Sequence, residues 1–106
     1  MAKFSLTKLG ENDLLEIGLY TLENHGAAQK QKYLAKLDAR FQWLANNPRL
    51  GSPRDEIKAG YKSWNEGGHA IFYRVTGGNI EIIGIPHQSM DIEQRLSTES
   101  PKKETL

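Results

Sequence analysis

The chain has 106 residues, a formal net charge of +1 and no cysteine. This length suits one domain with one core. The lack of cysteine excludes disulfides, thiolate metal sites and cysteine nucleophiles. No stretch is apolar enough to cross a bilayer and the N-terminus has no signal-peptide pattern, so we expect a soluble, cytoplasmic protein.

The first half of the chain predicts one strand and two helices. Polar and apolar residues alternate over 3–7, which favours a short strand. A helix is expected to start at 10–12 and end near Gly26, a plausible C-cap. A second helix is expected over 27–46, where apolar residues recur every three or four positions. The short break makes the two helices an antiparallel hairpin.

Apolar residues recur at helical spacing along the first predicted helix. Its predicted stripe consists of Leu14, Ile17 and Leu22, with Leu15 and Leu19 beside them. We expect this stripe to pack on the rest of the domain.

The second half predicts three strands, over 60–65, 69–75 and 80–86. The last two are joined by the turn 76–79, whose Gly and Asn residues suit a tight hairpin. Consecutive strands with tight turns favour a small antiparallel sheet, and the helical hairpin must cover one face of it. The fold class is therefore α+β, with the order β-α-α-β-β-β.

The C-terminal segment is predicted to contribute little to the core. Residues 91–96 can form one short helical turn. Residues 97–106 are polar and charged, as in a flexible tail. We therefore expect a single domain over 1–96 and a tail over 97–106.

Charge is distributed unevenly. Residues 27–64 contain eight Lys or Arg and three acidic residues, and the rest of the chain is net acidic. A basic segment can indicate a partner of negative charge, either nucleic acid or an acidic protein. On charge alone a solvated helix face is the simpler explanation.

His87 follows the last predicted strand and precedes a polar segment. An imidazole can serve as an acid or a base near neutral pH. A structural histidine bonded to backbone or to Asp91 explains the same pattern, and on sequence alone it is the favoured interpretation. The three histidines have no metal-binding spacing, and no phosphate-binding loop or nucleophile elbow occurs, so we expect no metal and no cofactor.

Taken together, the motifs and their order resemble the ParE branch of the ParE/RelE toxin superfamily from about Lys3 to Leu96. The segments that carry the resemblance are Asp13-Leu14-x-x-Ile17 … Tyr20, Tyr33-Leu34-x-x-Leu37 … Phe41-x-x-Leu44-Ala45-x-Asn47-Pro48-x-Leu50-Gly51-x-Pro53-Arg54-Asp55-Glu56-Ile57, Gly60-Tyr61-Lys62, Gly68-His69-x-Ile71-Phe72-Tyr73-Arg74 and Ile83-x-Ile85-x-His87-x-x-Met90-Asp91. Each segment is short, and their shared order and spacing make the resemblance specific.

The resemblance implies two N-terminal helices packed on an antiparallel sheet. It also implies the toxin of a type II toxin–antitoxin system, with a cognate ParD-type antitoxin as partner and DNA gyrase as target. No enzymatic activity and no specific DNA binding without the antitoxin are expected. The antitoxin groove is expected to involve the helical hairpin and the sheet edges, and the free toxin to expose apolar surface there.

The same superfamily contains RelE-type toxins, which cleave mRNA on the ribosome. The chain departs from that pattern, with Arg54 where some nucleases place a catalytic Glu and Trp64 where they place an Arg. His87 matches a histidine of some nucleases, but Gln88 replaces the aromatic residue beside it. A third hypothesis is a non-toxic remnant that only binds antitoxin.

We therefore predict a non-enzymatic gyrase inhibitor whose residues act by contact. The candidate residues for contact with target or partner, carried over by motif position, are Arg54, Tyr73, Arg74, His87, Met90 and Asp91. The two arginines are expected to pair with carboxylates or phosphates.

Overall fold

The computed structural model describes residues 2–87. Its elements are β1 (Phe4–Leu6), α1 (Lys8–His25), α2 (Ala27–Asn46), the 3₁₀ turn η1 (Pro48–Leu50), β2 (Ser52–Pro53), β3 (Lys62–Glu66), β4 (His69–Thr76) and β5 (Asn79–Gly84). The α+β class and the predicted order are confirmed, and η1 and β2 are additional. The predicted helical turn at 91–96 and the tail at 97–106 lie outside the described residues.

Helix α1 begins at Lys8, earlier than the predicted start at 10–12, because Thr7 caps it. The Thr7 hydroxyl accepts a hydrogen bond from the Gly10 N–H at 3.0 Å and donates one to the Ile83 carbonyl at 2.8 Å. Gly10 has a different task, since a Cβ there would lie 2.8 Å from the Ile82 carbonyl oxygen. The glycine lets the helix approach β5 closely.

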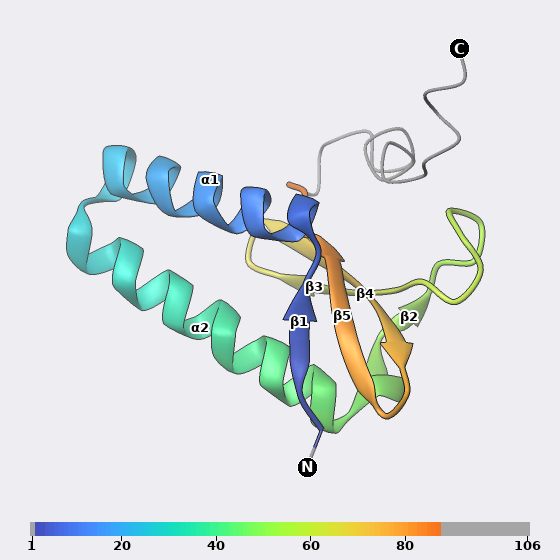
Figure 1. Ribbon diagram of the computed structural model, residues 1–106. Helices are drawn as coiled ribbons and strands as arrows, with labels where there is room; N and C mark the ends of the chain where they lie inside the picture. The colour runs from blue at the N-terminus through green and yellow to red at the C-terminus, as the bar shows by residue number, and fades with distance from the viewer. Residues whose placement is uncertain (1, 88–106) are drawn as a thin grey trace.

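The two helices form the predicted antiparallel hairpin (Figure 1). Gly26 joins them with φ 90°, a backbone conformation that glycine adopts without strain, and its N–H donates to the Leu22 carbonyl at 3.1 Å. The end of the hairpin where α1 meets α2 extends beyond the sheet (Figure 1). Within residues 2–87 no helix is both long and apolar enough to cross a membrane.

The sheet has the strand order β1-β5-β4-β3-β2. The pairings β3–β4 and β4–β5 are antiparallel, as predicted for strands joined by tight turns. Strand β1 instead pairs in parallel with β5, with Phe4 opposite Ile80 and Leu6 opposite Ile82. The sheet is therefore mixed rather than antiparallel throughout. A parallel pair needs a long crossover connection, and here the helical hairpin provides part of it.

The main core lies between the helical hairpin and one face of the sheet. Its buried residues are Ile17, Leu37, Phe41, Leu44, Ala45, Ile71, Tyr73, Ile80, Ile82 and Ile85. The opposite face of the sheet has a smaller cluster of Tyr61, Ala70, Phe72 and Ile83, with Leu9 and Ile57 packed against it. Successive side chains of a strand point to opposite faces of the sheet, so β4 and β5 each contribute residues to both clusters.

Candidate functional site

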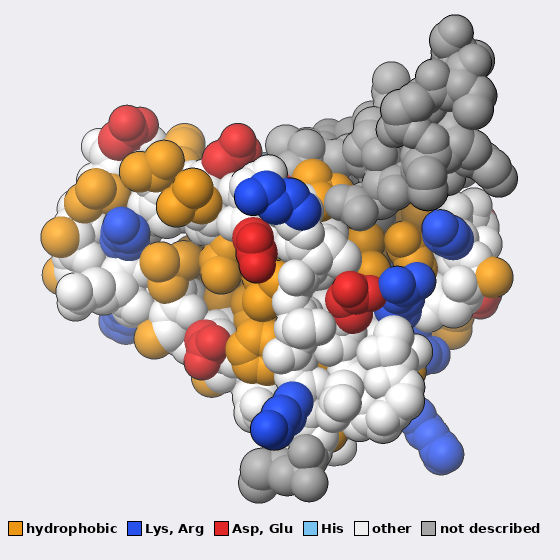
Figure 2. Space-filling view, in the orientation of Figure 1, with side chains coloured by type: hydrophobic (Ala, Val, Ile, Leu, Met, Phe, Trp, Pro, Cys, Tyr) orange, Lys and Arg blue, Asp and Glu red, His pale blue; other side chains and the backbone are white. Residues whose placement is uncertain are grey.

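A stripe of exposed leucines runs along α1. The spacing of Leu15, Leu19 and Leu22 places them on one face of the helix. That face is not buried, since the three side chains are 65%, 48% and 39% exposed. Hydrophobic side chains accordingly gather over α1 at the upper left of Figure 2. Of the predicted stripe, Ile17 is buried and Leu14 is half-buried. Helix α1 thus has two apolar faces, and within residues 2–87 only one of them is buried.

A groove of about 610 Å³ lies between the two helices, the β3–β4 turn and the chain that follows β5. Its apolar lining consists of Ile17, Ile85 and Pro86. Its polar and aromatic lining consists of Asp13, Glu16, Tyr20, Thr21, His25, Gln29, Tyr33, His69 and His87, with Gly68 at the turn. No Lys or Arg belongs to the described lining.

Asp13 fixes one wall of the groove. Its carboxylate accepts a hydrogen bond from the Ile85 N–H at 2.9 Å, and the residue is only 4% exposed. The bond joins α1 to the chain just after β5, so the helix and the end of the sheet cannot separate without exposing a buried backbone donor.

His69 and His87 face each other across the groove end. The two residues form an isolated antiparallel β-bridge, and their rings lie 5.5 Å apart at 79°. His69 Nδ1 lies 3.0 Å from the Tyr33 hydroxyl. Burial, and then the neighbouring His87, lower the pKa of His69, which favours a neutral imidazole at neutral pH.

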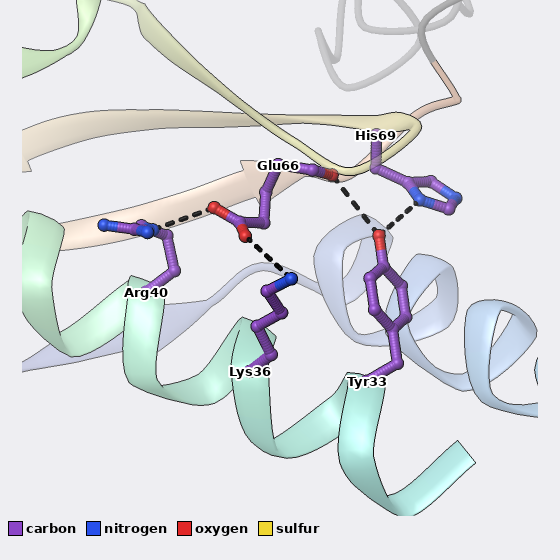
Figure 3. A network of polar contacts seen from close by, with 5 residues as sticks. All are labelled: Tyr33, Lys36, Arg40, Glu66 and His69. Carbon is purple, nitrogen blue, oxygen red and sulfur yellow. Dashed lines mark hydrogen bonds and ion pairs between the residues drawn. The ribbon is translucent and has the colours of Figure 1, made fainter. Parts of the chain in front are cut away.

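Tyr33 connects this pair to an ion-pair network between α2 and β3 (Figure 3). Its hydroxyl donates to the Glu66 carbonyl at 3.3 Å. The Glu66 carboxylate is bonded by Arg40 Nε at 2.8 Å and lies 3.9 Å from Lys36 Nζ. Burial, and then Glu66, raise the pKa of the Tyr33 phenol. Part of the basic charge on α2 is therefore paired inside the molecule.

Arg54 and Arg74 lie on the sheet face opposite the helices. Arg54 Nε bonds the Glu56 carboxylate at 2.6 Å, and its guanidinium lies 5.1 Å from the Phe72 ring centre. Arg74 follows two residues after Phe72 on β4 and pairs with Glu81 at 2.8 Å. Both arginines are accessible, and each has a carboxylate partner in its own chain.

The remaining predicted residues are placed differently. Tyr73 is fully buried, and its hydroxyl accepts from the Gly51 N–H at 2.9 Å and donates to the Pro48 carbonyl at 2.8 Å. Tyr73 therefore has no exposed surface for a partner, and its predicted role as a contact residue does not fit the structure. His87 is exposed and lines the groove, at the far end of β4 from Arg74. Met90 and Asp91 lie outside the described residues.

Comparison with known proteins decides the family. The model of the ParE toxin of the type II toxin–antitoxin system parDE matches residues 4–92. The chain belongs to the ParE toxin family. Toxin ParE1 of Mycobacterium tuberculosis is 36% identical over 96 residues, which cover 90% of this chain and 98% of the relative. Toxin ParE1 of Caulobacter vibrioides is 34% identical over 96 residues, which cover 91% and 99%.

Two solved structures share the fold of this ParE family member. The chromosomal ParDE system from P. aeruginosa matches with a TM-score of 0.68 and 19% identity, over 82% of this chain and 96% of that chain. The toxin–antitoxin complex RelBE2 from M. tuberculosis matches with a TM-score of 0.59 and 21% identity, over 82% and 98%. At these identities the likeness concerns the fold.

The groove was not apparent from the sequence. Glu16 and Tyr20 are spaced four residues apart on α1, which could have placed them on one helix face. Nothing in the sequence indicates that Tyr33 on α2 would meet His69 at the start of β4. Over residues 2–87 no group of three or more potential ligands is arranged to hold a metal ion.

Proposed function

We propose that this ParE-family toxin inhibits DNA gyrase by direct protein contact, without catalysis, and that a ParD-type antitoxin neutralises it. The observation that carries the proposal is the family match over residues 4–92, since the matched family is defined by the parDE system. The curated relatives, which match almost over their full length, carry the name Toxin ParE1.

The exposed face of α1 supports an antitoxin partner. Contiguous apolar side chains that stay exposed on a free domain commonly mark a protein interface. Leu15, Leu19 and Leu22 have the i, i+4, i+7 spacing with which a helix packs against another helix or an extended segment. One solved structure with this fold is a toxin–antitoxin complex, and another is a ParDE system.

The charge of the groove supports a non-enzymatic mechanism. Cleavage of a phosphodiester needs cationic groups near the developing charge as well as an acid and a base. His69 and His87 supply two imidazoles, but the described lining has no Lys or Arg, and Asp13 and Glu16 are acidic. This combination disfavours an RNA backbone beside the histidines, and with it a RelE-type ribonuclease.

The internal pairing of basic residues agrees with the expected lack of specific DNA binding without antitoxin. Arg40, Arg54 and Arg74 each bond a carboxylate of the same chain. Pairing lowers the charge available for phosphate contacts, which provide most of the affinity of proteins for DNA.

The proposal is tested by adding purified toxin to two reactions, gyrase supercoiling of plasmid DNA and translation by programmed ribosomes. We expect supercoiling to fail while the mRNA stays intact, and added antitoxin to restore supercoiling. Cleaved mRNA with normal supercoiling would establish the RelE-type activity instead. No effect in either reaction, with antitoxin binding retained, would identify a non-toxic remnant.

A further inference from the structure

Glu16 is an acidic side chain that supports no other group in the described part of the chain. It is exposed on α1 and lines the groove, and its carboxylate makes no hydrogen bond or ion pair with any other described residue. The other acidic lining residue, Asp13, is buried and holds the Ile85 N–H. A carboxylate at the mouth of a groove whose described lining has no Lys or Arg attracts a positive group of a ligand.

Aromatic side chains border the same groove. Tyr20 lies one helical turn beyond Glu16 and is 63% exposed, and Tyr33 and His69 line the groove from α2 and β4. The face of a tyrosine ring attracts a guanidinium or an ammonium. The apolar lining of Ile17, Ile85 and Pro86 suits the methylene stem of a long basic side chain.

The groove adjoins the leucine stripe of α1. Glu16 lies three residues before Leu19, so these two side chains are neighbours on the surface of α1. A partner that packs on Leu15, Leu19 and Leu22 therefore passes the mouth of the groove. The surface at α1 therefore presents the leucine stripe and, beside it, a groove with acidic and aromatic lining.

We propose that the groove receives one basic side chain, an arginine or a lysine, of the antitoxin segment that packs on α1, and that Glu16 selects its positive charge. This inference rests on the proposed function, because it concerns the partner expected there. Glu16 would act as a specificity residue. An antitoxin with a neutral residue at this position would leave the Glu16 carboxylate without a charge partner, and one with an acidic residue would be repelled by it.

The test uses the full chain and a small probe. N-acetyl-L-arginine amide is titrated into ¹⁵N-labelled toxin, and the backbone amide signals of Glu16, Tyr20 and His69 are followed by NMR. The neutral isostere N-acetyl-L-citrulline amide is titrated in parallel. We expect saturable shifts at these residues with the arginine probe, and binding roughly three- to tenfold weaker with citrulline, the range for an exposed charge pair with a cation–π contact.

Two variants of the same helix separate charge selection from general effects. Glu16→Gln should weaken arginine binding roughly two- to fivefold, less than the citrulline substitution because the aromatic contacts remain, and leave citrulline binding unchanged. Glu23→Gln makes the same change at an exposed position outside the groove and should leave both unchanged. Equal binding of the two probes, no effect of Glu16→Gln, or shifts scattered away from the groove would each overturn the inference.

The titration separates this inference from the proposed function, because it uses neither gyrase nor antitoxin. Gyrase inhibition without arginine binding at the groove would refute the cation site and leave the gyrase proposal standing. Arginine binding at the groove with unaffected gyrase would support the site and refute the proposed target.

Discussion

The Tyr73 hydroxyl joins the 3₁₀ turn η1 to the centre of the sheet. It accepts from the Gly51 N–H and donates to the Pro48 carbonyl, and a Cβ at Gly51 would collide with it. Burial raises the pKa of this phenol, while the bond from Gly51 acts in the opposite direction. The residue is better explained by this structural task than by the partner contact that its motif position implied.

Replacing Tyr73 by Phe should lower the free energy of unfolding by about 1–3 kcal/mol, because it leaves a buried N–H and a carbonyl without partners. Urea unfolding measures this loss. Tyr20→Phe is the matched control, since Tyr20 is exposed, and should change stability by less than about 0.5 kcal/mol. Equal effects of the two substitutions would show that the Tyr73 hydroxyl does not support the turn.

His69 should make stability depend on pH. Its pKa is lowered by burial and then by His87, with Tyr33 and Glu66 as the other groups that face this region. In the window from the unfolded pKa of about 6.5 down to the lower folded pKa, the unfolded chain binds more protons. Stability should therefore fall as pH decreases through this window, by at most about 1.4 kcal/mol per pH unit.

Urea unfolding at several pH values between about 7.5 and 5.5 measures this dependence. His69→Asn retains a polar group near the position of Nδ1 and should reduce the slope. A wild-type stability that is flat or rises on acidification would contradict the assignment.

At the level of elements, α1 shows where sequence reasoning succeeds and where it stops. Its existence, its end at Gly26 and its pairing with α2 follow from periodicity and glycine placement. Its buried face does not, because leucines occupy both faces and periodicity cannot say which one meets the sheet. The helix also starts two residues before the predicted boundary, because Thr7 caps it and Gly10 serves close packing on β5.

In the sheet and the groove, too, the sequence predicts local contacts and not those between distant positions. Tight turns specify the antiparallel strands β3, β4 and β5, so the sequence predicts them. The parallel pairing of β1 with β5 and the meeting of Tyr33 with His69 join positions far apart in the chain, and local patterns carry no signal for such contacts. Of the predicted contact residues, only Arg54, Arg74 and His87 are both described and accessible.

The leucine stripe of α1 predicts a separation of stability from partner binding. The double substitution Leu15→Ala and Leu19→Ala removes exposed side chains, so the free energy of unfolding should change by less than about 1 kcal/mol. Antitoxin affinity, measured by calorimetry, should fall at least about tenfold, because apolar contacts of the interface are lost.

Leu50→Ala is the control for this pair, since Leu50 is 53% exposed and lies in η1, outside α1. It should leave antitoxin affinity unchanged. Unchanged affinity of the double variant would mean that the antitoxin binds elsewhere.

For the whole molecule, charge and shape favour action by contact. Three arginines, Arg40, Arg54 and Arg74, each pair with a carboxylate of the same chain. The groove carries acidic and aromatic groups, and α1 presents leucines beside it. Such a surface is suited to binding a protein and poorly suited to cutting a phosphodiester.

The proposed inhibition of gyrase by binding is tested most directly by a stoichiometric titration. Toxin is added to a fixed amount of gyrase well above the dissociation constant, and the loss of supercoiling is measured. The account predicts that inhibition increases with the ratio of toxin to gyrase and is complete only when binding sites are filled. Supercoiling that persists at excess toxin, while trace amounts cut many equivalents of ribosome-bound mRNA, would contradict it.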